Sequence, residues 1–409
     1  MGRRGGVYGS GCEMKILVSN IGSTSFKFRL FDLSAGRREI ASGGADRIGG
    51  SGGTLKLQAA GKTAAEARDF ADHGAAIRCV LDRLVALGAL ARPEELDAVA
   101  FKAVMGGDLP AVAIVDDKVL RQMEYFVPVA PAHNPPYIAA MRMFKTVLGD
   151  TPLVAAFEPG FHRTNPPRRR HYAVPPEWAE KYGVRRYGFH GASHRYIADR
   201  ARELQKDARR IISCHLGGSS SIAAIRDGQS VATSMGLSPQ SGLPQGNRVG
   251  DFDIYGMKLM MTATGRSFDD LLGELGSKSG LAGLSGTSGD MRDIQQAAAG
   301  GSKRAKLALE VFVTAVRDYL GAYLVELGGA DAIVFTGGIG EHNPNLRADI
   351  CAGLEFAGIV LDSAKNAAAT GDPEARIDAA GSTTALWVMP TNEELIVAGL
   401  AAELLNKRS

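Results

Sequence analysis

The sequence is poor in cysteine, in net charge and in long apolar runs, and each shortage excludes a class of protein. The four cysteines, at positions 12, 79, 214 and 351, lie far apart and form no C-x-x-C pair, which argues against a zinc site or a disulfide framework. A formal net charge of +3 gives no general attraction to nucleic acid or to a membrane surface. No apolar run reaches the roughly 18 residues of a membrane span. We therefore expect a protein of the reducing cytoplasm.

The first 13 residues, MGRRGGVYGSGCE, are basic and rich in glycine but lack the apolar centre of a signal peptide. We expect them to be a disordered extension, with the folded chain starting near Met14. The composition of the whole chain, with 45% hydrophobic residues, 22% charged residues and 51 glycines, is typical of a soluble α/β protein with many loops. A length of 409 residues predicts two or three domains.

An unusual turn joins the first two apolar runs. The stretch LVSNIGSTSFKFRLFD, Leu17 to Asp32, alternates like two strands, but an amide, a glycine and three hydroxyl residues lie between them. A hairpin needs only one or two residues that tolerate positive φ. The extra hydroxyl and amide groups can donate hydrogen bonds to a phosphate. An ordinary polar hairpin tip would show the same pattern.

The same plan returns about one domain length later, in RIISCHLGGSSSIAAIRDGQSVATS, Arg210 to Ser234. An apolar strand runs into Gly217-Gly218 and three serines, and a second strand then leads to an Asp-Gly hairpin turn. Two such tips predict a duplicated fold with a phosphate-binding hairpin in each half, and a cleft between two similar domains.

Apolar periodicity predicts the remaining elements. Helical spacing covers residues 64–90, 303–327 and 394–405, and short strands are expected at 96–104, 153–157, 332–336 and 386–389. The segment NPPRRRHYAVPPEW is expected to be a domain boundary or a long loop. The segment GGIGEHN, residues 337–343, is expected to be a glycine-rich loop that lets a nucleotide approach the backbone. A tight strand-to-helix turn is the alternative.

Taken in order, the quoted segments resemble the acetate kinase family, within the superfamily of actin, sugar kinases and heat-shock chaperone ATPases. Further matching segments are APAHNP, RRYGFHGASHRYIADRA, GNRVGDFD, SGTSGDMRDI and MPTNEELIVA. The resemblance runs from about residue 15 to about residue 403, and RYGFHGASHRY is too long to match by chance.

The resemblance implies an α/β fold of two similar actin-like, ribonuclease H-like domains with the active site in the cleft, and usually a homodimer. We expect an N-terminal domain at 14–165, completed by a C-terminal helix at 395–409, and a nucleotide-binding domain at 166–394. The implied reaction is reversible transfer of a phosphoryl group from ATP to a short carboxylic acid, which gives an acyl phosphate and ADP. The implied metal is Mg²⁺ or Mn²⁺.

Transfer between a carboxylate and a triphosphate brings anions together, so the protein must supply positive charge and donors. By resemblance, Arg248 binds the transferring phosphoryl group, which a guanidinium can hold in a fork geometry. His190 is implied as a donor that stabilises the transition state, and His133 is a weaker candidate in the substrate pocket. His194 and His162 are expected to be structural.

The metal and nucleotide ligands also come from the resemblance. Asn20 and Glu393, both expected at strand ends, match the positions around magnesium, whose preferred ligands are oxygen atoms. The residues that match the nucleotide site are His215, Gly217, Gly218, Ser219, Asp290, Met291, Arg292, Gly338 and Ile339.

The chain departs from the family at four positions near the chemistry. An arginine is replaced by Lys102, which keeps the charge but loses the bidentate fork. The catalytic aspartate becomes Glu158, which is one methylene longer. Gly218 and His342 each replace an amide residue beside the nucleotide.

The acyl pocket departs as well. By resemblance its wall is built from Val104, Ala132, Phe189 and Pro239. The family commonly has leucine where this chain has Ala132. Because a methylene that fills an apolar pocket is worth about 1 kcal/mol, the loss of that side chain predicts an acid larger than acetate, such as propionate.

The sequence leaves three hypotheses open. The leading one is an ATP-dependent kinase of acetate or propionate. The second is a related enzyme that uses another phosphoryl donor, such as pyrophosphate, or a different acid. The third is a nucleotide-binding regulatory protein with reduced turnover, because fold alone does not determine function.

Overall fold

The structure is a computed structural model that describes residues 14–22, 24–34 and 38–407. The chain divides into two α/β units: unit 1 comprises Met1–Gly160 and Asn392–Ser409, and unit 2 comprises Phe161–Thr391. The sequence-based expectation put the divisions at residues 165 and 394. The expected N-terminal extension, with Cys12, lies outside the described residues.

Unit 1 is built on an eight-stranded mixed sheet with the order β5-β4-β3-β2-β1-β6-β8-β7. Its strands are β1 (Lys15–Ile21), β2 (Ser25–Asp32), β3 (Arg38–Asp46), β4 (Thr54–Ala59), β5 (Lys62–Ala67), β6 (Ala98–Ala103), β7 (Val112–Ile114) and β8 (Leu153–Phe157). The adjacent strands β1, β6 and β8 are parallel, so their carboxyl ends lie at one edge of the sheet.

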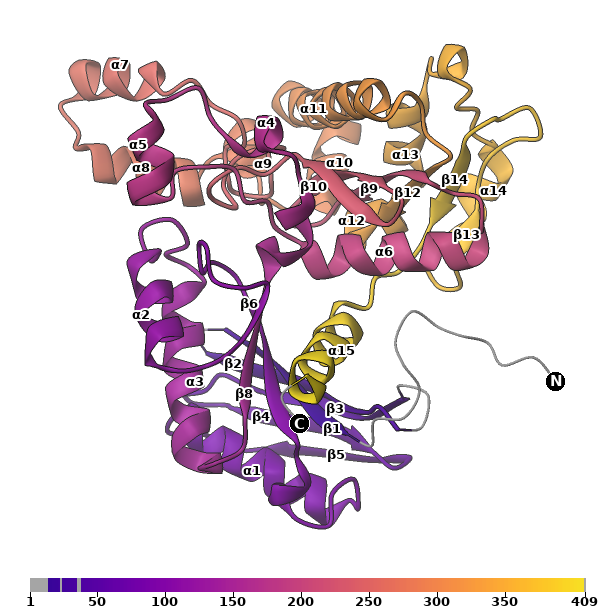
Figure 1. Cartoon of the computed structure of the whole chain (residues 1–409). Coiled ribbons are helices and arrows are strands. Elements are labelled where there is room, and N and C mark those ends of the chain that lie inside the picture. The colour runs from indigo at the N-terminus through magenta and orange to yellow at the C-terminus, as the bar shows by residue number, and fades with distance from the viewer. Residues whose placement is uncertain (1–13, 23, 35–37, 408–409) are drawn as a thin grey trace. The chain divides into compact units, whose positions relative to one another are not determined.

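Four main helices belong to unit 1: α1 (His73–Ala86), α2 (Asp117–Tyr125), α3 (Asn134–Leu148) and α15 (Glu393–Asn406). Figure 1 shows α1 and α3 on one side of the sheet and the yellow C-terminal helix α15 on the other. Phe144 of α3 packs edge-on against Phe26 and Phe101 of the sheet. A helix from the end of the chain therefore completes the N-terminal unit.

The opening hairpin forms as the sequence predicted. Strands β1 and β2 pair antiparallel, with Asn20 opposite Lys27, and the amide of Gly22 donates to the carbonyl of Ser25 at 2.9 Å. The predicted helix at 64–90 is wrong at its start. Residues 64–67 belong to β5, which pairs with β4, and α1 begins only at His73 because the Asp72 carboxylate caps it.

Unit 2 has a six-stranded sheet with the order β11-β10-β9-β12-β14-β13. Its strands are β9 (Arg210–His215), β10 (Ser221–Arg226), β11 (Gln229–Thr233), β12 (Ala332–Thr336), β13 (Ala375–Arg376) and β14 (Ala385–Val388). Its helices are α4 (Pro167–Arg170), α5 (Pro176–Tyr182), α6 (Gly191–Leu204), α7 (Tyr255–Thr264), α8 (Phe268–Ser277), α9 (Gly280–Ser285), α10 (Met291–Ala299), α11 (Lys303–Leu327), α12 (Gly337–His342), α13 (Pro344–Cys351) and α14 (Ser363–Ala368). In the two units together, short 3₁₀ turns lie at Pro93–Glu95, Glu158–Thr164 and Glu355–Ala357.

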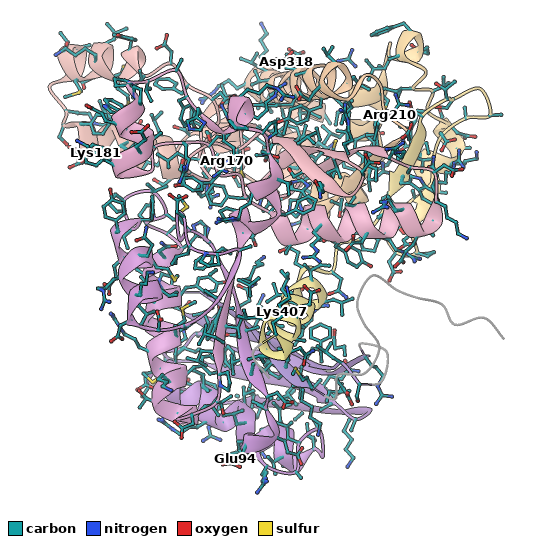
Figure 2. All side chains as sticks on the ribbon, viewed as in Figure 1. Glu94, Arg170, Lys181, Arg210, Asp318 and Lys407 are labelled. Atoms are coloured by element: carbon teal, nitrogen blue, oxygen red, sulfur yellow. The ribbon has the colours of Figure 1, made fainter. Side chains whose placement is uncertain are left out.

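The central strands of unit 2 are buried on both faces, which explains their unbroken apolar runs. Ile333 and Phe335 of β12 pack on the side of α11, whereas Ala332 and Val334 pack on the side of α6. Figure 1 shows these two helices on opposite sides of the strands. Arg210, labelled in Figure 2, donates from Nη2 to the Asp331 carboxylate at 2.6 Å and ties the start of β9 to the start of β12.

Two expectations in unit 2 need correction. The segment after β12 is a short helix, α12, that follows the strand directly, so the expected loop is wrong and the alternative, a tight strand-to-helix turn, is confirmed. Gly337 makes this turn at φ 77°, and a Cβ there would lie 2.7 Å from the carbonyl oxygen of Leu216, so only glycine fits. The proline- and arginine-rich segment contains the short helices α4 and α5.

A fully buried arginine supports the end of α12. The Arg347 guanidinium donates to the carbonyls of Gly340 and Glu341, each at 2.8 Å, and to Asn366 and the carbonyl of Ala369. Burial lowers the pKa of Arg347 to about 10.

Among the described residues, no helix has the length and apolar character that crossing a membrane requires.

We predict that Arg347→Leu lowers the free energy of unfolding by about 3–5 kcal/mol, because several buried carbonyl groups lose their donor. The measurement is urea unfolding followed by circular dichroism. The control is Arg226→Leu, which removes an exposed guanidinium that donates to one carbonyl, that of Glu326. Equal effects of the two substitutions would contradict the prediction.

Candidate active site

The carboxyl ends of three parallel strands gather the polar side chains of unit 1. Asn20 lies near the end of β1, Lys102 near the end of β6, and Glu158 directly after β8. This edge is where ligands usually bind to open α/β sheets. Glu393 joins them as the first residue of α15, so the expectation of a strand end at this position is wrong.

Lys102 forms ion pairs with two carboxylates, and we call Lys102, Glu158 and Glu393 the carboxylate cluster. The Lys102 ammonium contacts Glu393 Oε2 and lies 3.9 Å from Glu158 Oε1. Only 5% of Glu158 is exposed. Burial alone would lower the pKa of Lys102, but the two carboxylates outweigh it and raise that pKa.

Tyr137 of α3 connects Asn20 to this cluster, although nothing in the sequence patterns had singled it out. Its hydroxyl donates to Asn20 Oδ1 at 3.1 Å. Burial, together with Glu158 and Glu393, raises the pKa of Tyr137 to about 12, while Lys102 acts in the opposite sense. A tyrosine three residues after Asn134 lies on the same face of α3, and this spacing is the signal that could have identified it.

The donor set of unit 1 fits a magnesium ion that brings other ligands with it. Two carboxylates and one ammonium leave the carboxylate cluster with a charge of −1. Among the described residues, no group of three or more His, Cys, Asp or Glu side chains is arranged to hold a metal. Mg²⁺ is usually held by one or two carboxylates together with waters and substrate phosphates, so the small number of carboxylates here is compatible with such an ion.

The remaining candidates of unit 1 lie around the loop after β6. Val104 is buried, Ala132 is exposed, and His133 is half-buried at the start of α3. The buried amide of Asn134 donates to the carbonyls of Met105 and Met123 and so fixes this loop against α2 and α3. Of the four expected wall residues of the acyl pocket, Val104 and Ala132 belong to unit 1, whereas Phe189 and Pro239 belong to unit 2.

Histidines gather at the start of α6 in unit 2. His190 precedes the helix in the left-handed conformation, at φ 56°, and its ring stacks on that of His215 with the centroids 4.2 Å apart. His194 and His162 are buried and hydrogen-bonded to serine hydroxyls. Burial lowers the pKa of His162 to about 4 and lowers that of His194 well below its usual value, so both are neutral.

Arg248 lies among acceptors of the neighbouring loops. Its Nη1 atom is 3.2 Å from Gln245 Oε1, 3.4 Å from Ser219 Oγ and 3.4 Å from the carbonyl oxygen of Pro239. Ser219 itself donates to Gln245 Oε1 at 2.8 Å. Burial lowers the pKa of Arg248, although the guanidinium stays charged at neutral pH. Gln245 is a further residue that the motifs did not reveal.

A cavity of about 520 Å³ lies at the carboxyl ends of β9 and β12. Its lining residues are Gly217, Gly218, Gly289, Asp290, Met291, Arg292, Gln295, Gly338, Ile339, His342 and Asn343. We call it the glycine-lined cavity. It brings together all the expected nucleotide residues except His215 and Ser219, which contact His190 and Gln245 instead.

Local contacts define the walls of this cavity. Asp290 caps α10, and the hydrogen bonds from Arg292 lower the pKa of Asp290 to about 2. Gln295 donates to Asn343 Oδ1 at 3.1 Å, so α10 is joined to the start of α13. Gln295 and Asn343 were not among the residues expected from the sequence.

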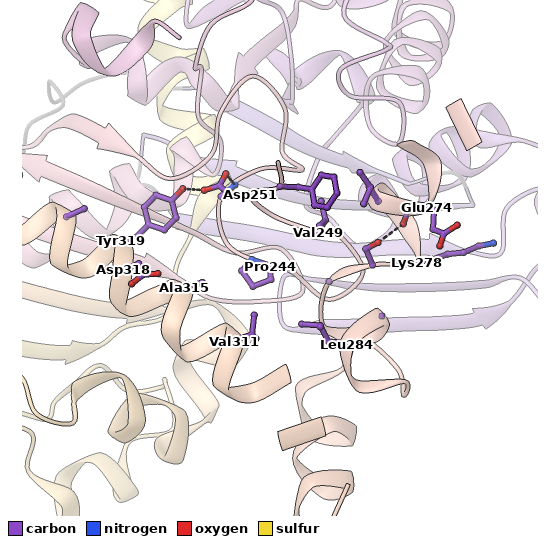
Figure 3. Close-up of a pocket in the computed structure, with 17 residues that line it drawn as sticks. Pro244, Val249, Asp251, Glu274, Lys278, Leu284, Val311, Ala315, Asp318 and Tyr319 are labelled. Atoms are coloured by element: carbon purple, nitrogen blue, oxygen red, sulfur yellow. Dashed lines mark hydrogen bonds between the residues drawn. The ribbon is translucent and has the colours of Figure 1, made fainter. Parts of the chain in front are cut away.

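A larger cavity of about 780 Å³ lies elsewhere in unit 2, between α8 and α11. Figure 3 shows Pro244, Val249, Leu284, Val311 and Ala315 along it, and the hydroxyl of Tyr319 donating to Asp251 at 2.5 Å. None of the expected nucleotide or catalytic residues lines this cavity, so size alone does not identify the functional site.

Known proteins of one family match the chain along almost its whole length. The model of the acetokinase family matches residues 15–399. The acetate kinase of Shouchella clausii is 40% identical over 388 residues, which cover 94% of this chain and 98% of that protein.

Solved structures of an acetate kinase and a propionate kinase also match the chain. The acetate kinase of Porphyromonas gingivalis has a TM-score of 0.85 at 36% identity and covers 96% of this chain and all of its own. A propionate kinase from Francisella tularensis has a TM-score of 0.86 at 32% identity, with 94% of this chain and 98% of that one covered. The fold is therefore that of the two-domain, actin-like α/β kinases, as the sequence predicted. More particularly, the chain belongs to the acetokinase family.

We predict that Lys102→Met lowers the free energy of unfolding by about 2–3 kcal/mol at pH 7.5, because two buried carboxylates lose their ammonium. Without the ammonium, the two buried carboxylates can lose their charge only by taking up protons. The deficit is therefore largest at neutral and higher pH and shrinks as the pH falls towards 5. Urea unfolding between pH 5 and 8 measures it.

The control is Lys15→Met, since Lys15 pairs with Glu95 at 2.7 Å in the same unit, but both side chains are about one-third exposed. Such a pair contributes little, so we expect a small effect with no recovery in acid. A Lys102→Met deficit that is independent of pH would contradict the account of the carboxylate cluster.

Proposed function

We propose that this protein is an ATP-dependent carboxylate kinase, which transfers a phosphoryl group reversibly from ATP to acetate or to a slightly larger short-chain acid. The observation that carries the proposal is the glycine-lined cavity, because seven residues expected to bind the nucleotide line it together. Membership of the acetokinase family supports the same reaction.

Unit 2 would bind ATP. Glycines 218 and 338 line the cavity and would present backbone amides to phosphate, and a Cβ at either would meet no atom within 4 Å. The amide of Gly217 already donates to Ser220 Oγ at 3.1 Å. The Asp290–Arg292 pair and Ile339 would form the walls around the nucleoside. His342, which replaces a smaller residue, narrows this cavity without closing it.

The transfer itself needs little covalent chemistry from the protein. A carboxylate oxygen of the acid attacks the γ-phosphorus, a new P–O bond forms, and the bond to the β-phosphate oxygen breaks to release ADP. The acid is already ionised at neutral pH, so no base has to remove a proton. Arg248 and His190 would instead stabilise the charge on the phosphoryl oxygens, as a guanidinium and a ring N–H can.

Unit 1 would supply the metal ligands and hold the acid. Asn20 and Glu393 would bind Mg²⁺ or Mn²⁺, which when bound neutralises charge on the phosphate oxygens. Lys102 and Glu158 replace an arginine and an aspartate, so the cationic side chain becomes less branched while the anionic one becomes longer. Their 3.9 Å separation supports a preserved ion pair.

Ala132 supports a preference for a substrate acid that is larger than acetate. This small side chain is exposed just before α3, where a leucine would project three more carbon atoms into the space around it. Val104, buried in the loop after β6, keeps an apolar surface on unit 1. The proposal therefore favours propionate or a similar acid over acetate.

We predict that the protein, with Mg-ATP and hydroxylamine, forms hydroxamates from short acids. The rate should be highest for an acid with a longer chain than acetate. Arg248→Ala should lower the rate at least a hundredfold, because the charge on the phosphoryl group loses its guanidinium. The panel runs from formate to butyrate and branched acids. No turnover with any acid, while ATP still raises Tm, would favour a regulatory protein; turnover with pyrophosphate alone would favour another donor.

We predict that Ala132→Leu shifts the preference towards acetate, lowering kcat/KM for propionate relative to acetate about tenfold. The added side chain fills the space that the longer acid would use. Ala139→Leu, at an exposed position within α3, is the matched control and should leave the ratio unchanged. An unchanged ratio in Ala132→Leu would contradict the assigned pocket wall.

We infer that the protein works in the cytoplasm as a homodimer. The cysteines that the structure describes, Cys79, Cys214 and Cys351, are free and buried, which suits a reducing compartment. The helix pair α7 and α8, with the residues just before α7, supports the dimer, because its large apolar side chains face outward. These are Phe252, Ile254, Tyr255, Leu259, Met260, Phe268 and Leu272, each between 42% and 79% exposed.

Only Met257 of α7 and Leu271 of α8 are buried, so neither helix covers its apolar face within the chain. Such a contiguous patch is typical of a subunit interface. A second copy would cover it.

We predict that Leu259→Asp converts the dimer to a monomer, because a carboxylate would be buried in the apolar contact. Light scattering coupled to size-exclusion chromatography measures the mass. Val325→Asp is the control, since Val325 is 83% exposed near the end of α11, away from α7 and α8. A wild-type mass of one chain, or dissociation by both substitutions, would contradict the assignment.

A further inference from the structure

The Lys102 ammonium is bound directly to Glu393, one of the two residues proposed above to bind magnesium. It contacts Glu393 Oε2, and Glu158 Oε1 lies 3.9 Å away. Although burial opposes it, the two carboxylates raise the pKa of Lys102, so the ammonium is charged at neutral pH. A positive charge of the chain itself therefore already lies beside the carboxylate that a metal ion would use.

Asn20, the other proposed metal ligand, lies close to the same charges. The Tyr137 hydroxyl is 3.1 Å from Asn20 Oδ1. Besides burial, all three members of the carboxylate cluster shift the pKa of Tyr137, so this one side chain has Asn20 and the cluster as neighbours. An ion held by Asn20 and Glu393 and the ammonium of Lys102 would therefore share one small region.

A divalent ion and an ammonium in one region repel each other, and water screens the repulsion only weakly in a mostly buried site. The affinity of a protein site for such ions increases with the negative charge of its ligands. With the ammonium in place the cluster has a charge of −1, and without it the two carboxylates have a charge of −2. Lys102 therefore opposes the binding of a divalent ion.

A second carboxylate lies within reach of the same ammonium. Glu158 Oε1 is only 3.9 Å from it, and the Lys102 side chain is 23% exposed. A lysine has a compact charge on a flexible stem, whereas an arginine has a rigid, planar group. The ammonium can therefore leave Glu393 for Glu158 and still keep an ion pair.

We propose that Lys102 occupies the metal position at Glu393 when no metal is bound, and that its ammonium moves towards Glu158 when a divalent ion enters. Lys102 thereby weakens the binding of free metal, so that the ion enters together with substrate phosphates, whose negative charge offsets the ammonium. The inference rests on the proposed function, in which Asn20 and Glu393 are the metal ligands.

The test is the binding of Mn²⁺ to the full chain without nucleotide or acid, measured from the EPR signal of free Mn²⁺. We expect Lys102→Met to lower the Kd for Mn²⁺ at least tenfold. Lys102→Gln removes the same charge but keeps a donor for the carboxylates, so it guards against a failure of Lys102→Met to fold, and it should show the same gain. A Kd equal to or above that of the wild type in a folded variant would overturn the inference.

Two controls locate the ion. Lys102→Met combined with Glu393→Gln should lose the gain in affinity, because the proposed ligand is removed. Arg142→Met removes a cation that lies 2.5 Å from Glu124 on the surface of the same unit, and its Kd should stay within twofold of the wild type. A gain that persists in the double variant, or that is equally large in Arg142→Met, would overturn the inference, since the ion would then bind elsewhere.

The movement of Lys102 has its own readout in the wild-type chain. With ¹³C-labelled lysine, the ε-carbon signal that is missing from Lys102→Gln belongs to Lys102. We expect saturating Mg-ADP to shift this signal and ADP alone to leave it in place. A signal that Mg-ADP does not shift would overturn the proposed movement.

None of these measurements depends on turnover, so the inference and the proposed function can fail separately. Tighter Mn²⁺ binding in Lys102→Met without phosphorylation of any acid would refute the proposed kinase and leave the metal position at Glu393 in place. Phosphorylation of an acid by the wild type, with an unchanged Kd for Mn²⁺ in Lys102→Met, would support the kinase and overturn the inference.

Discussion

The buried charge of two glutamates is the constraint on which the unit 1 site depends. Glu158 follows β8 and Glu393 begins α15, and both would be costly to bury without a cation. Lys102 supplies that cation from β6. This ion pairing also joins the last helix of the chain to the N-terminal sheet. The geometry of the site therefore rests on one ammonium group, while buried apolar residues of α15 such as Ile396 and Val397 also hold that helix on the sheet.

Unit 2 places most of its candidate polar groups at the ends of its strands. Its central strands are mainly apolar on both faces, although Ser213 lies buried within β9 and Arg347 is buried nearby in α13. Glycines line the cavity at one such place, and Arg248 and His190, which we propose as side-chain donors, lie in other loops of the unit. Buried serines hold the histidine rings, and Arg347 holds the short helix after β12.

The sequence predicted the first two strands, the central strands of both sheets and the helices α11 and α15, because unbroken apolar runs carry that information. It did not predict strands β3 to β5 or the long helices α3 and α6. It failed where a contact between distant residues decides the outcome. The start of α1 depends on pairing of β5 with β4, and the hydrogen bond between Tyr137 and Asn20 joins residues far apart in the chain. Gly337 looked like part of a loop because a glycine-rich segment does not reveal which backbone lies against it. The hydrogen bonds that join His194 to Ser213 and Ser221, and Ser221 to His190, are invisible in the sequence for the same reason.

The most direct test of the proposed kinase is ³¹P NMR of the product formed from ATP and ¹⁸O-labelled propionate or acetate. The account predicts an acyl phosphate whose bridging oxygen is ¹⁸O, formed in equal amount with ADP, because the carboxylate oxygen attacks phosphorus. Release of inorganic phosphate and ADP without acyl phosphate would contradict it. So would an acyl phosphate with ¹⁶O in the bridge, since that product requires attack at the carboxyl carbon.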